Sequence, residues 1–280
     1  VYLYKIGNLE DNSTYKHWNG ASLSTNNSTV ELTASDRTNY DYFGGTVSVV
    51  SSSQGIFSLI GAMGEDTSHS QAGSVYLFRT YDGYTKEIQT IRNPGSYSSD
   101  KFGVSLDIVS GSDGLYCAIG ENAGTGTAGG SQAHVYKVTG LNFSSISKIS
   151  TFQPTDETAQ TKGFGQGLSM VSSSYEHGIY ISAGCDDYNK VFLFSMTSDG
   201  ATTEIAELTA SNPSAGFLDR FGRQTDLHVT NQGRIYTYVG ATHADFEGQT
   251  NKGAAYAYET FDGITNQIQV FTLHLLKRHL

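Results

Sequence analysis

Apolar and polar residues alternate over short stretches along much of the chain, which is the pattern of half-buried β-strands. Residues 46–50 read TVSVV and residues 74–78 read SVYLF. Alternation of this kind turns one face of a strand toward a core and the other toward water. No segment shows a sustained apolar period near that of a helix, so we expect little helix. The pattern predicts an all-β protein.

The same succession of strands and turns occurs four times. Each copy begins with a Phe-Gly pair, and the period is about 60 residues. The copies start near residues 43, 102, 164 and 221. The first copy predicts strands at 45–50, 56–62, 74–79 and 86–91, and the later fourth strands are expected near 144–152, 203–208 and 266–273. Four short strands in a repeat of this length favour one blade of a β-propeller.

The first copy carries a family resemblance. Phe43-Gly44 opens its first strand, Gly61-Ala62 follows its second, and Gly73-Ser74-Val75-Tyr76 opens its third. These motifs resemble the FG-GAP repeat of the integrin α-subunit β-propeller, and the resemblance covers nearly the whole chain. It implies an all-β fold, a β-propeller of four-stranded antiparallel blades. We therefore expect a single propeller domain over residues 1–280, with four full repeats and a half-repeat at residues 1–42.

The half-repeat raises the question of how the propeller closes. Residues 1–5 resemble a third strand, and the chain opens in mid-strand without an initiator Met, so we expect a fragment or a processed chain. The expected strands do not make a whole number of blades, and an uncovered strand edge is unfavourable. Three completions are open: sequence upstream, closure against the strand at 266–273, or strand donation by a second copy. Donation would make a homo-oligomer or a filament.

Charge and processing signals restrict the partners and the compartment. The net charge of −10 argues against nucleic acid or an anionic membrane, because both need a basic surface. No apolar run is long enough to span a bilayer. Glycosylation sequons occur at Asn12, Asn26, Asn27 and Asn142. They favour an extracellular, secreted glycoprotein. For Cys117 and Cys185 we prefer two small buried thiols, with a disulfide left open.

The calcium loops of the family are missing. The turns between first and second strands carry only Asp113 and Glu176 as acids, whereas calcium needs several converging oxygen ligands. We therefore predict no metal site and no cofactor. An acid precedes the Phe-Gly pair by two positions in three repeats, at Asp41, Asp100 and Asp219. We expect these carboxylates to accept backbone N–H groups at the turn into the first strand.

Candidate ligand-binding residues gather on the loops of one propeller face. The connections between strands two and three, and between strands four and one, share that face. The acids and rings on it are Tyr40, Glu65, Asp66, Glu121, Asp186, Asp187, Tyr188, His243 and Asp245. Such residues on loops can bind a cationic or sugar ligand. His243, Asp245 and Glu247 alternate, but this spacing is too generic to predict a metal centre. We assign no catalytic residue.

The main functional prediction is an extracellular, non-enzymatic binding or structural protein, an integrin-α-like propeller for adhesion or assembly. Its partner would be an extracellular protein or a glycan. One alternative is a carbohydrate-binding lectin, which repeated pairs of an aromatic ring and an acid would favour; Asp187-Tyr188 is one such pair. A second alternative is a hydrolase that uses the loop-face carboxylates. The chain has no G-x-S-x-G motif, so a serine nucleophile of that type is not indicated.

Overall fold

The computed structural model describes residues 2–4, 16–17, 29–66, 69–93, 100–122, 130–160, 163–175, 178–211, 219–246 and 250–272.

The half-repeat contains β1 (Tyr2–Tyr4), β2 (Lys16–His17) and β3 (Thr29–Glu31). The first repeat contains β4 (Phe43–Ser52), β5 (Gly55–Ala62), β6 (Ser74–Tyr81) and β7 (Tyr84–Arg92), and the second contains β8 (Leu106–Gly111), β9 (Gly114–Glu121), β10 (Gln132–Thr139), η1 (Leu141–Phe143) and β11 (Ser145–Phe152). After α1 (Glu157–Gln160), the third contains β12 (Phe164–Ser172), β13 (Ile179–Cys185), β14 (Lys190–Met196) and β15 (Thr202–Thr209), and the fourth contains β16 (Phe221–Val229), β17 (Ile235–Ala241), β18 (Ala254–Phe261) and β19 (Ile264–Thr272).

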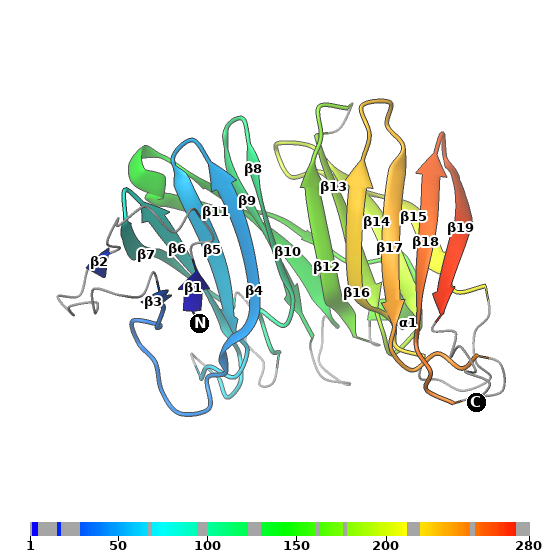
Figure 1. Ribbon diagram of the computed structural model, residues 1–280, viewed down its shortest axis with the longest axis horizontal. Helices are drawn as coiled ribbons and strands as arrows, with labels where there is room; N and C mark the ends of the chain where they lie inside the picture. Colours follow the sequence, from blue (N-terminus) through cyan, green and yellow to red (C-terminus); the bar gives the residue numbers. More distant parts are fainter. Residues whose placement is uncertain are drawn as a thin grey trace, which may run out of the picture. The chain divides into compact units, whose positions relative to one another are not determined.

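The four strands of each repeat form one sheet in chain order (Figure 1). The fold is therefore all-β and built from the four-stranded antiparallel sheets of a propeller, as the repeat pattern predicted. The observed bounds extend the expected strands by a few residues at most. The strand β2 was not expected: it adds parallel to β7, pairing Lys16 with Tyr84. The outer strand β7 offers unpaired backbone groups at the edge of its sheet, which explains why a neighbouring segment pairs there.

The Phe-Gly pair is a β-bulge at the start of the innermost strand. The register between the first and second strands shifts directly after Phe43, Phe164 and Phe221. The glycine that follows has a left-handed backbone, with φ 80° at Gly165 and φ 94° at Gly222. Only glycine adopts this region without strain. The repeated dipeptide is thus a backbone requirement of the strand entry.

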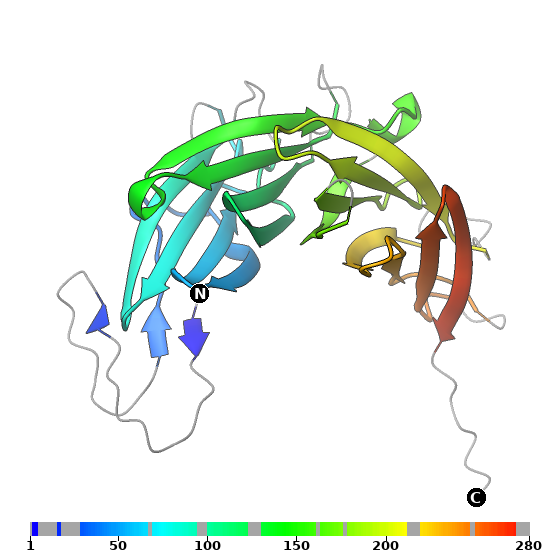
Figure 2. The same cartoon turned by 90° about the horizontal axis from the view of Figure 1, so that it is seen from above.

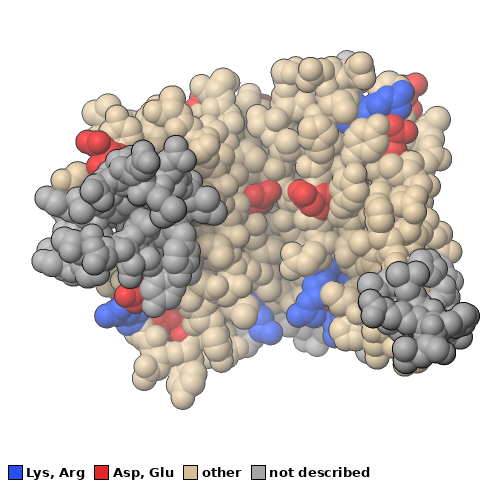
Figure 3. All heavy atoms as spheres, viewed as in Figure 1, with Lys and Arg blue, Asp and Glu red and all other residues tan. Residues whose placement is uncertain are grey.

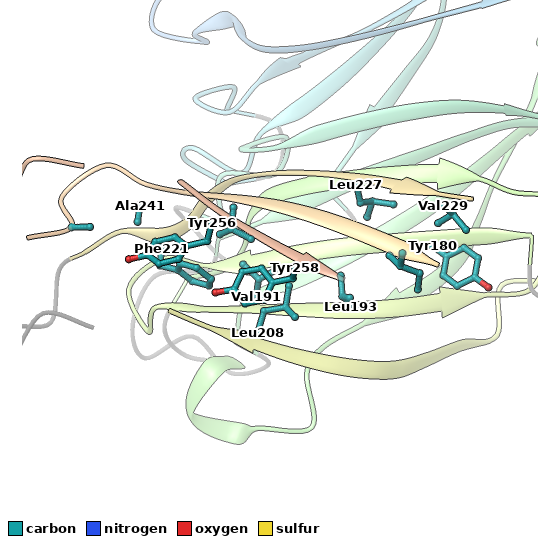
Figure 4. Packing of buried hydrophobic residues seen from close by; sticks show 13 residues of the cluster. Tyr180, Val191, Leu193, Leu208, Phe221, Leu227, Val229, Ala241, Tyr256 and Tyr258 are labelled. Carbon is teal, nitrogen blue, oxygen red and sulfur yellow. The ribbon is translucent and has the colours of Figure 1, made fainter. Parts of the chain in front are cut away.

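The phenylalanines of these pairs anchor the cores. Phe102, Phe164 and Phe221 are fully buried, as expected for equivalent positions. In Figure 4, Phe221 lies with Tyr256 and Tyr258 of its own sheet and with side chains of the preceding sheet. Phe43 differs, because it is only partly buried. It packs on Tyr76 and Phe78 at centroid distances of 5.6 and 6.2 Å.

Hydroxyl and carboxylate groups link neighbouring innermost strands at one repeat position. The residue five places after the Phe is serine in the first and third repeats and aspartate in the second and fourth. Ser48 Oγ donates to Asp107 Oδ1 over 2.8 Å, and Ser169 Oγ donates to Asp226 Oδ1 over 3.3 Å. The alternation therefore gives each serine an acidic partner on the next strand.

The chain divides into two compact units, residues 1–117 with 136–147, and residues 118–135 with 148–280. Each has its own hydrophobic core. In the first unit, β1 and β3 pair antiparallel and lie side by side in Figure 2. The prediction of one domain over residues 1–280, and the three possible completions of the half-repeat, stay predictions. In the described ranges, no helix is long and apolar enough to cross a membrane.

Candidate functional site

An acidic pair at the loop end of the third repeat is the most unusual site of the described chain. Asp186 and Asp187 directly follow β13, and Arg220 directly precedes β16. Arg220 Nη1 donates to Asp187 Oδ1 over 2.5 Å and to Asp186 Oδ2 over 3.3 Å. Arg223 Nη1 lies 3.8 Å from the same Asp186 oxygen. All four residues belong to the second unit.

The two carboxyl groups have different environments. The side chain of Asp186 is 0% exposed, whereas that of Asp187 is 44% exposed. Burial, and then the charge of Asp187, raise the pKa of Asp186 against the opposing effect of Arg220 and Arg223. Asp186 Oδ1 has no hydrogen-bond partner although it is buried. Such an atom is costly to bury and calls for an explanation, such as a ligand or a water molecule at that place.

Gly163 lies directly beside this atom, and its backbone has no side chain that would separate it from the two aspartates. A Cβ at Gly163 would lie 3.4 Å from both Asp186 Oδ1 and Asp187 Oδ2, and 2.8 Å from Gln166 Nε2. We name the place between these groups the Gly163 notch. It is bounded by two carboxylate oxygens and one amide nitrogen. Hydroxyl groups are the natural partners of such a set, because they both donate and accept hydrogen bonds.

Glu65 lies in a second cluster, in the first unit. It contacts the Tyr76 hydroxyl, and Arg92 Nη1 donates to its Oε1 over 3.0 Å. The same tyrosine and arginine also bind Asp36, over 2.6 and 2.7 Å. Burial, followed by the hydrogen bonds to Asp36 and Glu65, raises the pKa of Tyr76. Each carboxylate therefore has donors within the cluster, and the set fastens the exit of the half-repeat to the first sheet.

Glu121 ends β9 and binds an imidazole. Its Oε2 lies 2.8 Å from His134 Nε2, and His134 Nδ1 lies 3.0 Å from Thr151 Oγ1. Glu121 and His134 are buried, while Thr151 is exposed. The chain of contacts runs from a buried carboxylate to a surface hydroxyl.

The other predicted loop-face residues have simpler roles. Asp66 Oδ1 accepts the N–H of Gln71, and Asp245 Oδ1 accepts that of Asn251, each over 2.7 Å, so these acids close their own loops. The Tyr188 ring lies under Lys190 Nζ at 4.6 Å. The remaining two are exposed: Tyr40 and His243.

The other sequence expectations have mixed outcomes. Asp41 accepts the backbone N–H and the hydroxyl of Thr38, as predicted for the acid before Phe-Gly. Cys117 and Cys185 are buried thiols that are not joined in a disulfide. Asn142 is exposed in η1, whereas the sequons at Asn12, Asn26 and Asn27 and the acid Glu247 lie outside the described residues. Secretion and glycosylation stay predictions.

Sequence reasoning missed Arg220 and Gly163, which complete the acidic pair. Both precede a Phe-Gly pair directly, and that position is left-handed in every repeat: φ is 55° at Tyr42, 49° at Lys101, 81° at Gly163 and 56° at Arg220. The third repeat alone has glycine there. The sequence Gly-Phe-Gly was a visible signal that a side chain is absent at this loop end.

Charge on the surface is dispersed where it can be seen. On the face drawn in Figure 3, acidic and basic side chains form small separate groups among other residue types. Within the part of the chain that the structure describes, no group of three or more His, Cys, Asp or Glu side chains is placed to hold a metal ion. The described loop ends thus offer carboxylates paired with arginine or histidine.

Comparison with known proteins identifies one repeat and the fold. Residues 27–78 match the model of the FG-GAP repeat family. No curated protein sequence matches the chain. A solved periplasmic gluconolactonase of Pseudomonas aeruginosa is similar, with 15% identity and a TM-score of 0.51, over 81% of this chain and 56% of that one. A GH43 endo-arabinanase of Bacillus licheniformis has 8% identity and a TM-score of 0.48, over 80% and 74% of the two chains. A GH32 β-fructofuranosidase of Bombyx mori has 13% identity and a TM-score of 0.46, over 79% of this chain and 49% of that one.

These likenesses correct the main functional prediction. The chain spans 56% of the length of the gluconolactonase, and identity this low establishes only a shared fold. The gluconolactonase is nevertheless named as an enzyme. The predicted non-enzymatic, integrin-like role in adhesion or assembly was therefore wrong, and the hydrolase alternative fits better. The resemblance to the repeat is confirmed: residues 27–78 are an FG-GAP repeat, in a chain with the fold of a β-propeller.

Proposed function

We propose that this chain is a hydrolase that acts through the carboxyl groups of Asp186 and Asp187. The observation that carries the proposal is their unequal environment: one is fully buried with a raised pKa, and the other is 44% exposed and paired with Arg220. Neighbouring carboxyl groups whose pKa values are pushed apart are the usual arrangement of an acid and a base in one site. The similarity to enzymes with a propeller fold supports the same class.

The two aspartates take complementary roles in this proposal. Asp187, as the carboxylate, accepts a proton from a water molecule while the water oxygen bonds to the electrophilic carbon of the substrate. Asp186 gives its proton to the leaving oxygen as the carbon–oxygen bond breaks, and the proton taken by Asp187 later restores it. Arg220 bonds both carboxyl groups and stabilises negative charge that develops between them. The side chain of Arg223, which is 52% exposed, lies beside Asp186 on the side of the solvent.

The Gly163 notch supports a hydroxylated substrate, such as a glycoside or a sugar lactone. Its two carboxylate oxygens and its amide are complementary to the hydroxyl groups of a sugar ring, and Asp186 Oδ1 lacks a partner that such a hydroxyl would supply. Apolar esters have no group to satisfy that oxygen. We therefore expect turnover to depend on ring hydroxyls near the reacting carbon.

The test is hydrolysis of a panel of p-nitrophenyl glycosides and sugar lactones by the purified chain. We expect turnover of at least one member, and a loss of about 10²–10⁴-fold in Asp187→Asn and Asp186→Asn. Asp262→Asn is the matched control, because Asp262 is exposed in a left-handed turn position that asparagine tolerates. Because Asp186 must be protonated, the wild-type rate should fall as the pH rises through its raised pKa. The absence of turnover on the whole panel, or full activity in Asp187→Asn, would overturn the proposal.

A further inference from the structure

A hydroxyl, an imidazole and a carboxylate are joined in series at the loop end of the second repeat. Thr151 Oγ1 lies 3.0 Å from His134 Nδ1, and His134 Nε2 lies 2.8 Å from Glu121 Oε2. They come from three successive strands, β11, β10 and β9, and all three residues belong to the second unit. None of them contributes to the Asp186 site.

Hydrogen-bond chemistry fixes the direction of this chain of contacts. A neutral imidazole has one N–H donor and one acceptor nitrogen. Because an ionised Glu121 can only accept, it takes the N–H of Nε2, and Nδ1 is then the acceptor. The Thr151 hydroxyl consequently donates to Nδ1. This is the arrangement in which a base is ready to take the proton of a hydroxyl, with a third group that holds the base in position.

Burial matches these roles. His134 is 1% exposed and Glu121 is 6% exposed, so the base is held away from water and its tautomer is set by the carboxylate. Thr151 is exposed on the outer strand of its sheet, so the residue can be reached from solution. A hydroxyl at the surface with its base beneath it can react with molecules in solution.

The imidazole is not a requirement of the scaffold. In the other repeats the third residue of the third strand is an aromatic ring that packs on the Phe of the Phe-Gly pair: Tyr76, Phe192 and Tyr256. The sequence alignment of the repeats places His134 at that position. Phenylalanine or tyrosine is sufficient where the ring only packs, and one of them occupies this position in the other three repeats. The second repeat instead combines an imidazole with an acid and a hydroxyl.

We propose that Thr151 is a nucleophile for acyl transfer, with His134 as its general base and Glu121 as a positioning residue. The substrate class is a small, activated ester. Thr151 Oγ1 bonds to the acyl carbon as its proton passes to His134 Nδ1. The bond from the acyl carbon to the ester oxygen then breaks, and that oxygen takes the proton from His134. The acyl group remains on Thr151 until a water oxygen bonds to the acyl carbon while His134 takes a proton from that water. The bond from the acyl carbon to Thr151 Oγ1 then breaks, Oγ1 takes the proton from His134, and the carboxylic acid leaves.

The experiment is acetylation of the full chain by p-nitrophenyl acetate, followed by release of p-nitrophenol and by peptide mapping of the acetylated protein. We expect a burst of p-nitrophenol and an acetyl group on Thr151. Thr151→Val, which keeps the shape but removes the hydroxyl, should lower the burst rate by about 100-fold or more. Thr151→Ser should retain it. Thr203→Val is the matched control, because Thr203 is also exposed on a fourth strand of the second unit.

The positioning role of Glu121 is tested by a measurement that would not change if the residue were purely structural. Glu121→Gln should lower the acetylation rate more than the apparent affinity and shift the pH at which the rate is half-maximal, and Glu121→Asp should restore part of the rate. Circular dichroism of each variant excludes unfolding as the cause. Acetylation that maps only to other residues, or an undiminished burst in Thr151→Val, would overturn the proposal. Because the label is read on Thr151 itself, this result is independent of whether the chain hydrolyses glycosides or lactones.

Discussion

The loop ends of the first and third repeats both carry a cluster of carboxylates. We call a cluster closed when its carboxylates have hydrogen-bond donors, and open when a buried carboxylate oxygen has none; the first repeat has a closed cluster and the third an open one. In the first repeat, Arg92 donates to both Glu65 and Asp36, and the Tyr76 hydroxyl lies between the two carboxylates with one proton to donate. In the third, Asp186 keeps a buried oxygen without a partner. One scaffold therefore holds a satisfied network and an unsatisfied one, and the difference separates a structural cluster from a candidate reactive site.

Two substitutions between the repeats account for the difference. Tyr76 and Phe192 occupy equivalent positions in their repeats. Each directly follows the valine that pairs with the glycine near the end of the second strand, Gly61 in one case and Gly184 in the other. The phenylalanine has no hydroxyl to donate. The residue before the Phe-Gly pair is a tyrosine in the first repeat and Gly163 in the third, so the third repeat also lacks a side chain that would fill the space.

The largest expected effect compares how much the Phe of the Phe-Gly pair stabilises the third and the first repeat. Phe164→Ala should destabilise the chain by about 3–5 kcal/mol, because it removes a fully buried ring. Phe43→Ala should cost clearly less, because Phe43 is only partly buried. Urea denaturation of the two variants measures the difference. Equal losses would show that both rings carry the same share of their cores.

The sequence predicted the scaffold well because its signals are local. The Phe-Gly pair forms a left-handed bulge because of its glycine, and runs of β-branched and aromatic residues such as those of β6 favour a strand. The expected alternation of residues 74–78 between core and water was wrong, because β6 is buried on both faces. The site was predicted only in part. Asp186 and Asp187 follow a recognisable strand, so their loop face could be inferred, whereas the approach of Arg220 depends on a contact between separate sheets. Partners that come from distant segments have no local pattern.

The second prediction breaks the closed cluster. Tyr76→Phe removes the hydroxyl between Glu65 and Asp36, and leaves a buried carboxylate with one donor fewer. We expect a loss of stability of about 1–3 kcal/mol, measured by thermal or urea unfolding. Hydrolytic activity should be unchanged if this cluster is only structural. A fall in activity without a fall in stability would instead assign catalysis to the first repeat.

The third prediction closes the open cluster. Gly163→Ala and Gly178→Ala should each cost about 1–2 kcal/mol, because both backbones are left-handed, with φ 81° and 78°. Only the Cβ at residue 163 would enter the notch, since nothing lies within 4 Å of one at residue 178. Gly163→Ala should therefore raise KM for a sugar substrate, while Gly178→Ala should not. Matching kinetics in the two variants would remove the notch from the substrate site.

The smallest expected effect concerns the pH dependence of stability. The pKa of Asp186 in the folded chain lies above its usual value of 3.8, so the folded chain keeps a proton that the unfolded chain has already released. The stability that this proton contributes is fully present below pH 3.8 and is lost as the pH rises through the raised pKa. Asp186→Asn resembles the protonated form and does not titrate, so its stability should fall less between acidic and neutral pH than that of the wild type. Urea midpoints across this range give the two slopes, with Asp262→Asn as the control that keeps the wild-type slope. The corresponding change in the closed cluster, Glu65→Gln, should destabilise the chain, because it weakens the bond to Arg92. If Asp186→Asn and the wild type lost stability in parallel, Asp186 would be a satisfied structural acid like Glu65, and the contrast between the two loop ends would fail.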